Sequence, residues 1–419
     1  MSHLPTSGNP RRPLGRRGFL GLVLAGAAGT AADLALPSRA DAIEAPSLPL
    51  TLEPSTVDFY GEHQAGIATA PPPHATLVAF ALHKSTTRAS LGRLLRVWTG
   101  TIEALTAGRA APGDSTPYLA SPDAHLTITV GVGPHLIKVA GRDPMDPTLT
   151  LPPFPIDALE TKWSGGDLVV QVCADDATTV THASRMLVRD AAPFATPTWR
   201  QSGFSGGRPD GTTRNLLGHV EGTGNHVPGT EAFDAAVWRN SGTPEWFIGG
   251  TTMLVRRIRF ELDTWDRLLP GVQDQVIGRR ASNGAPRGKD SLVDAPDFNQ
   301  IDTESDGPHV HDNGSVEVHA KVPSGLAIPE NAHIRRAHAA FNDGQTIFRR
   351  GWSYAEESGE QGLMFVSFQA DLEAYITIQN SLAALDALNT WTTPIGSAVF
   401  AVLPGCQPGD WLGRALVDD

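Results

Sequence analysis

Two stretches of the chain, residues 168–175 and 363–371, share the pattern that most constrains the fold. In each stretch an apolar run typical of a buried β-strand ends at an acidic residue, Asp175 or Asp371. A helical pattern begins directly afterwards. Such a repeated junction is what a duplicated α+β unit would produce. Any two strand–helix junctions look alike, however, so the repeat alone does not separate duplication from coincidence.

The segments of the N-terminal half follow the order of a ferredoxin-like unit, which is strand, helix, strand, strand, helix, strand. Apolar residues recur at helical spacing in the predicted helices and form alternating or continuous apolar runs in the predicted strands. The predicted segments are strands 75–82, 126–132 and 167–173 and helices 91–107 and 177–190.

The second half repeats this plan. Its predicted segments are strands 251–260, 362–369 and 397–403 and helices 265–277 and 372–388. Between them, residues 284–329 are rich in Asp, Gly, His and Pro and predict a long loop. We therefore expect an α+β fold of two ferredoxin-like domains with antiparallel sheets, spanning residues 43–215 and 216–419.

Composition sets limits on the class of protein. A chain of 419 residues is long enough for two domains, and 40% hydrophobic with 19% charged residues is typical of a globular protein. A formal charge of −12 argues against nucleic acid as a partner. The two cysteines, Cys173 and Cys406, are too few for a disulfide scaffold and form no C-x-x-C-H motif. We expect two buried free thiols rather than a bridge.

The N-terminal residues 1–42 are typical of a twin-arginine export signal. Arg16 and Arg17 precede an apolar run over 21–32, which is too short to span a bilayer, and a small-residue site follows at 40–42. The alternative is a disordered tail with chance arginines. The export signal predicts a periplasmic or extracellular protein without stable membrane insertion.

Three short motifs carry the expected chemistry: residues 214–225 (RNLLGHVEGTGN), 332–336 (AHIRR) and 349–354 (RRGWSY). Together they resemble the haem-site signatures of the dye-decolourising peroxidases, which are a Gly-x-x-Asp-Gly turn, a His-Ile-Arg iron ligand and an Arg-Arg-Gly-Tyr-Ser-Tyr strand. The resemblance covers nearly the whole chain after the export segment and includes residues 59–67 and 199–204. It looks like the branch that is exported by the twin-arginine system and includes iron-uptake-linked members.

The resemblance implies two ferredoxin-like domains with one haem b per chain, held mainly by the C-terminal domain. His333 matches the proximal iron ligand, because a neutral imidazole suits Fe(III) haem. Arg349 matches the distal arginine that stabilises negative charge as hydrogen peroxide splits. Arg350 would point the other way on a strand. The other expected haem contacts are Gly222, Thr223, Gly224, His338, Leu363 and Phe365, of which the last two are also compatible with ordinary core packing.

Glu221 departs from the family pattern, which has Asp at this position to move the peroxide proton between oxygens. Glu keeps the carboxylate but shifts it by about 1 Å or more, and such a misplacement can cost about 10²-fold in rate. Three outcomes stay open: a working substitute, a slow peroxidase that depends mainly on Arg349, or a haem-binding protein without useful turnover. His219 is a second candidate proton carrier if this segment is extended. Asn225 is kept from the family pattern, whereas His226 replaces its Pro.

Asp371 and Arg279 each have two interpretations. Asp371 matches an acidic family position and is either a partner for His333 or the N-cap of the following helix. Arg279 either contacts a haem propionate or lies at the surface.

The remaining candidates favour ordinary structural roles. Trp352 and Tyr354 would carry electrons from bulky substrates or simply pack beside the cofactor, and packing is the expectation. His309, His311 and His319 suggest a metal site, although a solvated loop is the favoured interpretation.

The sequence thus predicts a secreted haem b peroxidase that oxidises dye-like or phenolic substrates with hydrogen peroxide. Glu221 and Arg349 would promote O–O cleavage while His333 holds iron. The alternative is a haem- or iron-handling protein of a bacterial iron-uptake system with weak peroxidase activity. A homo-oligomer and partners of an iron-uptake system are compatible with the sequence, which selects neither.

Overall fold

The computed structural model describes residues 56–143, 149–207, 211–242, 244–302, 309–310, 316–317 and 325–418. The predicted export segment, 1–42, lies outside these residues, as do His311 and His319 and the side chain of His309.

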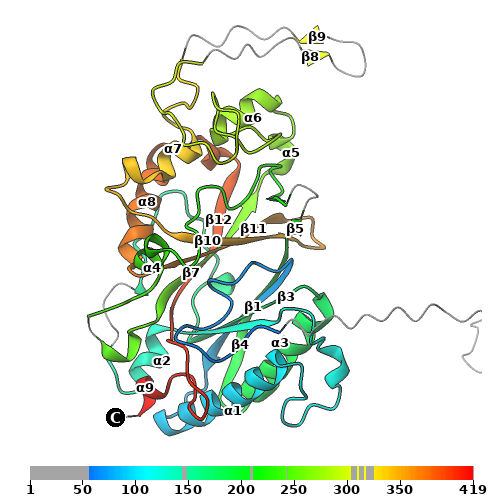
Figure 1. The fold of residues 1–419 in the computed structure, drawn as a ribbon, viewed down its shortest axis with the longest axis vertical. Helices are drawn as coiled ribbons and strands as arrows, with labels where there is room; N and C mark the ends of the chain where they lie inside the picture. The colour runs from blue at the N-terminus through cyan, green and yellow to red at the C-terminus, as the bar shows by residue number, and fades with distance from the viewer. Residues whose placement is uncertain are drawn as a thin grey trace, which may run out of the picture. The chain divides into compact units, whose positions relative to one another are not determined.

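The first half forms a four-stranded antiparallel sheet in the order β4-β1-β3-β2. Its strands are β1 (His74–Leu82), β2 (Thr127–Val132), β3 (Leu168–Ala174) and β4 (Ala195–Phe204). Its helices are α1 (Arg88–Thr106), α2 (Pro134–Val139) and α3 (Ala177–Ala191). Figure 1 shows α1 and α3 beside these strands.

The second half repeats the arrangement in the order β12-β7-β11-β10, again antiparallel. Its strands are β7 (Thr251–Phe260), β10 (Phe348–Ala355), β11 (Gln361–Gln369) and β12 (Thr392–Val402). Its helices are α4 (Glu231–Val237), α5 (Leu262–Trp265), α6 (Pro270–Ile277), α7 (His333–Ala337), α8 (Leu372–Leu385) and α9 (Arg414–Val417). Two short pairs complete the strands: β5 (Gly206–Gly207) with β6 (Thr213–Arg214), and β8 (His309–Val310) with β9 (Val316–Glu317).

The two sheets join into one closed barrel, because β2 pairs with β12 and β4 pairs with β10. The same strand order in both halves is that of two ferredoxin-like units, so the expected fold class is confirmed. Closure leaves neither sheet with a free edge at these junctions. The division at residue 215 stays a prediction.

Two predicted helices are shorter than expected. The segment 265–277 is wrong as one helix, since α5 ends at Trp265 and α6 begins at Pro270. Leu269, which precedes the proline, has an extended ψ of 144°, as proline imposes on its neighbour. The helix predicted to reach residue 388 ends at Leu385. The side chain of Asp386 caps a new 3₁₀ turn over Ala387–Thr390 instead.

The alternation of side chains on β10 and β11 sets two different faces. Trp352, Met364 and Phe368 are buried in a cluster with side chains from strands of both halves, which fills the barrel. Arg349 and Phe365 have the opposite parity and are only half-buried. The candidate site is built on this second face, outside the barrel.

Candidate functional site

His333 is the first residue of α7 and is paired with a carboxylate. Its Nδ1 lies 2.6 Å from Oδ2 of Asp386, whose side chain is only 3% exposed, whereas the His333 side chain is 31% exposed. Nε2 of His333 has no hydrogen-bond partner among the described residues. Burial disfavours the charged ring, but the charge and hydrogen bond of Asp386 outweigh it and raise the pKa of His333. The imidazole is therefore oriented through one nitrogen and open at the other.

Asp386, not Asp371, is the partner of His333. Asp371 caps α8, where its side chain accepts a hydrogen bond of 2.9 Å from the Glu373 amide. Its interpretation as a partner of His333 is wrong. Asp386 also accepts a 2.9 Å hydrogen bond from the Leu388 amide, so it is fixed at both oxygens. Sequence reasoning missed it inside a supposed continuous helix, although an acid that interrupts an apolar run is a recognisable cap signal.

Arg349 is held in place by the loop that carries Glu221. Its Nη2 donates to the carbonyl of Thr223 at 2.6 Å, and its backbone amide donates to Oδ1 of Asn225 at 3.0 Å. Nδ2 of Asn225 donates back to the Arg349 carbonyl at 2.7 Å. Burial lowers the pKa of Arg349, and the charge of Glu221 opposes that shift. Asn225 is thus a positioning residue that the predicted site did not include.

Glu221 is half-buried in the turn before this clamp. Its amide donates to the Thr213 carbonyl at 2.9 Å, and its Oε1 accepts a 2.6 Å hydrogen bond from Nδ2 of Asn215. Oε2 has no partner among the described residues. Gly222 and Gly224 follow with φ of 75° and 71°, a conformation that glycine adopts without strain. One carboxylate oxygen is therefore held by a hydrogen bond, and the other has no hydrogen-bond partner among the described residues.

Glu221, His333 and Arg349 come together in space although they lie far apart in sequence. The charge of Arg349 lowers the pKa of His333, and the charge of Glu221 raises it. The three predicted residues therefore lie close enough for the charges of Arg349 and Glu221 to shift the pKa of His333. Asp386, the fourth residue of the group, also shifts it.

Apolar side chains adjoin these polar groups. In the antiparallel register Gly351 lies opposite Phe365 and Ser353 opposite Leu363, so Leu363 and Phe365 share the face of Arg349. Both are half-buried and pack against core clusters, and their role as haem-lining residues stays a prediction. Further half-buried apolar side chains pack around the adjoining core, namely Leu216, Ile258, Ile334 and Trp391.

Two of the candidate histidines have local roles. His219 is 3% exposed and lies 3.3 Å from Asp274 through Nε2, so it belongs to the packed core instead of standing beside Glu221. His338 is exposed, and its Nδ1 accepts from the Ala340 amide at 3.2 Å. Burial and then the charge of Arg279 lower the pKa of His338.

Arg279, Trp352 and Tyr354 are all buried. Arg279 is 8% exposed and donates to the Gly284 carbonyl at 2.9 Å, so its interpretation as a surface residue is wrong. Trp352 and Tyr354 are 0% and 1% exposed. Trp352 donates to the Pro72 carbonyl at 2.9 Å on the barrel side of β10, which supports packing as its role.

Other predicted classes of site can be compared with the described residues. Cys173 and Cys406 are free and buried, as expected. Within the described ranges, no group of three or more His, Cys, Asp or Glu side chains has the arrangement of a metal site. No described helix is both long enough and apolar enough to cross a membrane.

The chain belongs to the Dyp-type peroxidase family. The family's N-terminal model matches residues 64–205 and its C-terminal model matches residues 212–407. Together these matches confirm the resemblance that the three motifs suggested.

Solved and curated relatives agree with this assignment. A DyP-type peroxidase from Cellulomonas bogoriensis is 42% identical with a TM-score of 0.78, covering 87% of this chain and 99% of its own. Ferric DtpA from Streptomyces lividans is 34% identical with a TM-score of 0.77, covering 89% and 100%. A deferrochelatase from Shigella flexneri is 34% identical over 88% of this chain and 91% of its own length.

Proposed function

We propose that this chain is a secreted haem b peroxidase that oxidises dye-like or phenolic substrates with hydrogen peroxide. The observation that carries the proposal is the proximity of His333, Arg349 and Glu221, whose charges shift one another's pKa values. Family membership supports the peroxidase reaction, and the arrangement of these side chains supports their individual roles.

The residues fit haem b. His333 has the donor arrangement that haem iron takes, with Nδ1 occupied by Asp386 and Nε2 without a protein partner among the described residues. Half-buried Leu363 and Phe365 offer apolar contact to a porphyrin plane. When bound, the haem supplies a redox-active iron that takes up electrons from the reducing substrate and passes them to peroxide.

Each side chain then has a defined task. Asp386 orients the His333 ring and increases its basicity, which favours iron in the ferric state. Arg349, fixed by Thr223 and Asn225, stabilises the negative charge that develops as the O–O bond breaks. Glu221 would accept a proton from one peroxide oxygen and return it to the other, so that the leaving oxygen departs as water.

Localisation belongs to the same proposal. The twin-arginine pattern of residues 1–42 supports export to the periplasm or beyond. Expression with and without residues 1–42, followed by fractionation, tests this. A protein that stays in the cytoplasm with residues 1–42 still attached would contradict it.

A second function is favoured by two observations. Relatives named deferrochelatase match 86% to 88% of the chain. The presence of Glu221 where the family pattern has Asp also favours a site that reacts slowly with peroxide. The second candidate is therefore a haem- or iron-handling protein with weak peroxidase activity.

Stopped-flow absorbance distinguishes the two functions. The haem-loaded protein is mixed with hydrogen peroxide beside Glu221→Asp and Glu221→Gln. A fast change of the Soret band in the natural protein that is lost in Glu221→Gln supports the peroxidase with Glu221 as its acid–base group. A slow change that Glu221→Asp accelerates supports the haem-handling function instead.

Iron release and haem binding complete the test. Incubation of the haem-loaded protein with a reductant and a ferrous chelator, analysed for iron-free porphyrin, measures the second activity directly. His333→Ala tests the iron ligand, because its Soret spectrum should lose the features of histidine ligation. An unchanged spectrum in that variant would reject His333 as the ligand.

A further inference from the structure

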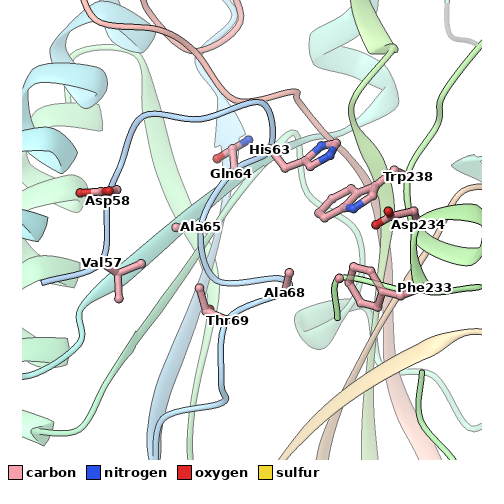
Figure 2. A pocket seen from close by; sticks show the side chains of 11 residues that line it. Val57, Asp58, His63, Gln64, Ala65, Ala68, Thr69, Phe233, Asp234 and Trp238 are labelled. Atoms are coloured by element: carbon pink, nitrogen blue, oxygen red, sulfur yellow. The ribbon is translucent and has the colours of Figure 1, made fainter. Parts of the chain in front are cut away.

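A cavity of about 340 Å³ lies apart from the site described above, between the segment 57–69 and helix α4. This size is at the lower end of the range of small-molecule sites, and one aromatic ring with a short substituent would fit. Figure 2 shows its wall of His63, Trp238 and Phe233 facing Ala65, Ala68 and Thr69. Residues 59–67 belong to the resemblance noted in the sequence, and the peroxide chemistry gives them no role.

The aromatic wall of this cavity is rigid. The rings of His63 and Trp238 are stacked 3.8 Å apart at an angle of 2°, and Nδ1 of His63 is fixed by a 2.7 Å contact to the Gly249 carbonyl. Phe233, which is 1% exposed, packs edge-on against Trp238 with centroids 5.9 Å apart. A preorganised wall of this kind loses little side-chain entropy when a ligand binds.

The charge of the lining selects the ligand. Asp58 and Asp234 are its carboxylates, and the described residues that line it include no Lys or Arg. Neither carboxylate has an ion-pair partner in the described part of the chain. Figure 2 shows the Asp234 carboxylate beside the Trp238 ring. Carboxylates next to aromatic rings attract a cationic ligand and repel an anionic one.

Aromatic contacts link this cavity to the strand that carries Arg349. Phe233 packs edge-on against Phe348, with centroids 5.0 Å apart, and Phe348 directly precedes Arg349 on β10. The chain segment that leads into α4 also supplies Thr223 and Asn225, which hold Arg349. Phe233 in the cavity wall therefore contacts the strand that carries Arg349, and the segment that holds Arg349 leads into the helix that lines the cavity.

We propose that this cavity binds a cationic aromatic amine, which serves as a reducing substrate of the peroxidase. The binding step stands alone, whereas the reducing role rests on the proposed peroxidase function. Each amine gives up one electron, across the contacts of Trp238, Phe233 and Phe348, and one proton to solvent. Two amines thus supply the two electrons and two protons that convert one hydrogen peroxide into two waters.

Binding is tested first, by calorimetry on the haem-loaded full chain. The probes are two anilines of opposite fixed charge, 4-amino-N,N,N-trimethylanilinium and sulfanilate. We expect the cation to bind and the anion not to bind. Asp234→Asn should weaken cation binding about fivefold, the usual effect of one exposed charge pair. Glu231→Gln is the matched control, since Glu231 is exposed on the same helix but does not line the cavity. Equal binding of both anilines, or equal loss in both variants, would overturn the proposal.

Turnover is tested second, with the same pair of anilines. Asp234→Asn should raise KM for the cationic aniline about fivefold at unchanged kcat and leave turnover of sulfanilate unaffected. Trp238→Phe keeps an aromatic wall that is harder to oxidise, so it should lower kcat for the cation alone. An unchanged kcat would remove the reducing role. The rate with peroxide in the absence of any aniline reports the proposed function separately, so a failure there is distinct from a failure of the cavity.

Discussion

Asn225 and Arg349 form a reciprocal pair, in which the Arg349 amide donates to Oδ1 of Asn225 and Nδ2 of Asn225 donates back to the Arg349 carbonyl. The distances are 3.0 and 2.7 Å. The side-chain amide of Asn225 thus pairs with the Arg349 backbone as a neighbouring strand would. Nε of Arg349 also reaches Oδ1 of Asn225, at 3.4 Å. One amide side chain therefore fixes both the backbone and the guanidinium of the candidate distal arginine.

Asn225→Ala should slow the reaction with peroxide without removing haem. Loss of the pair lets the guanidinium of Arg349 move, and misplacement by about 1 Å can cost about 10²-fold. Stopped-flow absorbance gives the rate, and the Soret spectrum confirms that haem is retained. His226→Ala is the control, because His226 directly follows Asn225 on the same loop. This variant removes a contact to Thr346 but none of the Arg349 hydrogen bonds. If both variants react as fast as the natural protein, Asn225 has no positioning role.

Asp386→Asn should raise the reduction potential of the bound haem. Loss of the carboxylate charge makes His333 less basic, which destabilises ferric iron relative to ferrous iron. Asn still accepts the hydrogen bond that caps the turn at Leu388, so the fold is kept. Asp371→Asn makes the same change at the N-cap of α8 and should leave the potential as it is. A spectroelectrochemical titration in which both variants shift equally would contradict the assignment of Asp386.

More of the fold than of the site could be predicted from the sequence. Periodicity placed most of the strands within one or two residues, since buried strands such as β1 and β3 are rich in apolar and β-branched residues. The closure of two sheets into one barrel was not predictable, because pairings such as that of Ser353 with Phe204 join distant segments and leave no local pattern. The predicted end of the helix at residue 388 is wrong, because the side chain of Asp386 caps a new turn there although the helical periodicity continues.

The motifs indicate those candidate residues whose side-chain type itself carries the expected chemistry. The motifs predict His333, Arg349 and Glu221, and the charges of Arg349 and Glu221 shift the pKa of His333. Asp386 and Asn225 were absent from the predicted site because their roles come from hydrogen bonds between distant segments, 53 and 124 residues apart. Nothing in a single sequence distinguishes such an Asp or Asn from a cap or a surface residue.

Both thiols should be unreactive in the folded protein. Burial raises the pKa of Cys173 to about 12 and that of Cys406 to about 11, so neither forms a thiolate at neutral pH. A disulfide-exchange reagent at pH 8 should label neither cysteine in the native protein and both after unfolding. Mass spectrometry counts the labels. Rapid labelling of the native protein, or failure to label the unfolded one, would contradict two buried free thiols.

The buried pair of Asp114 and His182 should make stability depend on pH in acid. Both side chains are 1% exposed, and Oδ2 of Asp114 lies 2.9 Å from Nε2 of His182. Burial opposes the charged carboxylate, but the Thr116 amide and His182 outweigh it and lower the pKa of Asp114 below its ordinary 3.8. A depressed carboxyl pKa contributes stability that is complete above pH 3.8. That contribution is lost as pH falls through the lower folded value.

Asp114→Asn isolates this contribution. It should reduce the free energy of unfolding by about 1–3 kcal/mol at pH 6, as expected for a weakened buried hydrogen bond. The difference from the natural protein should shrink as pH falls below the ordinary carboxyl value. Urea unfolding at pH 6 and pH 3 measures it, with the exposed Asp123→Asn as control. A deficit that stays constant between the two pH values would show that ionisation of Asp114 does not stabilise the fold.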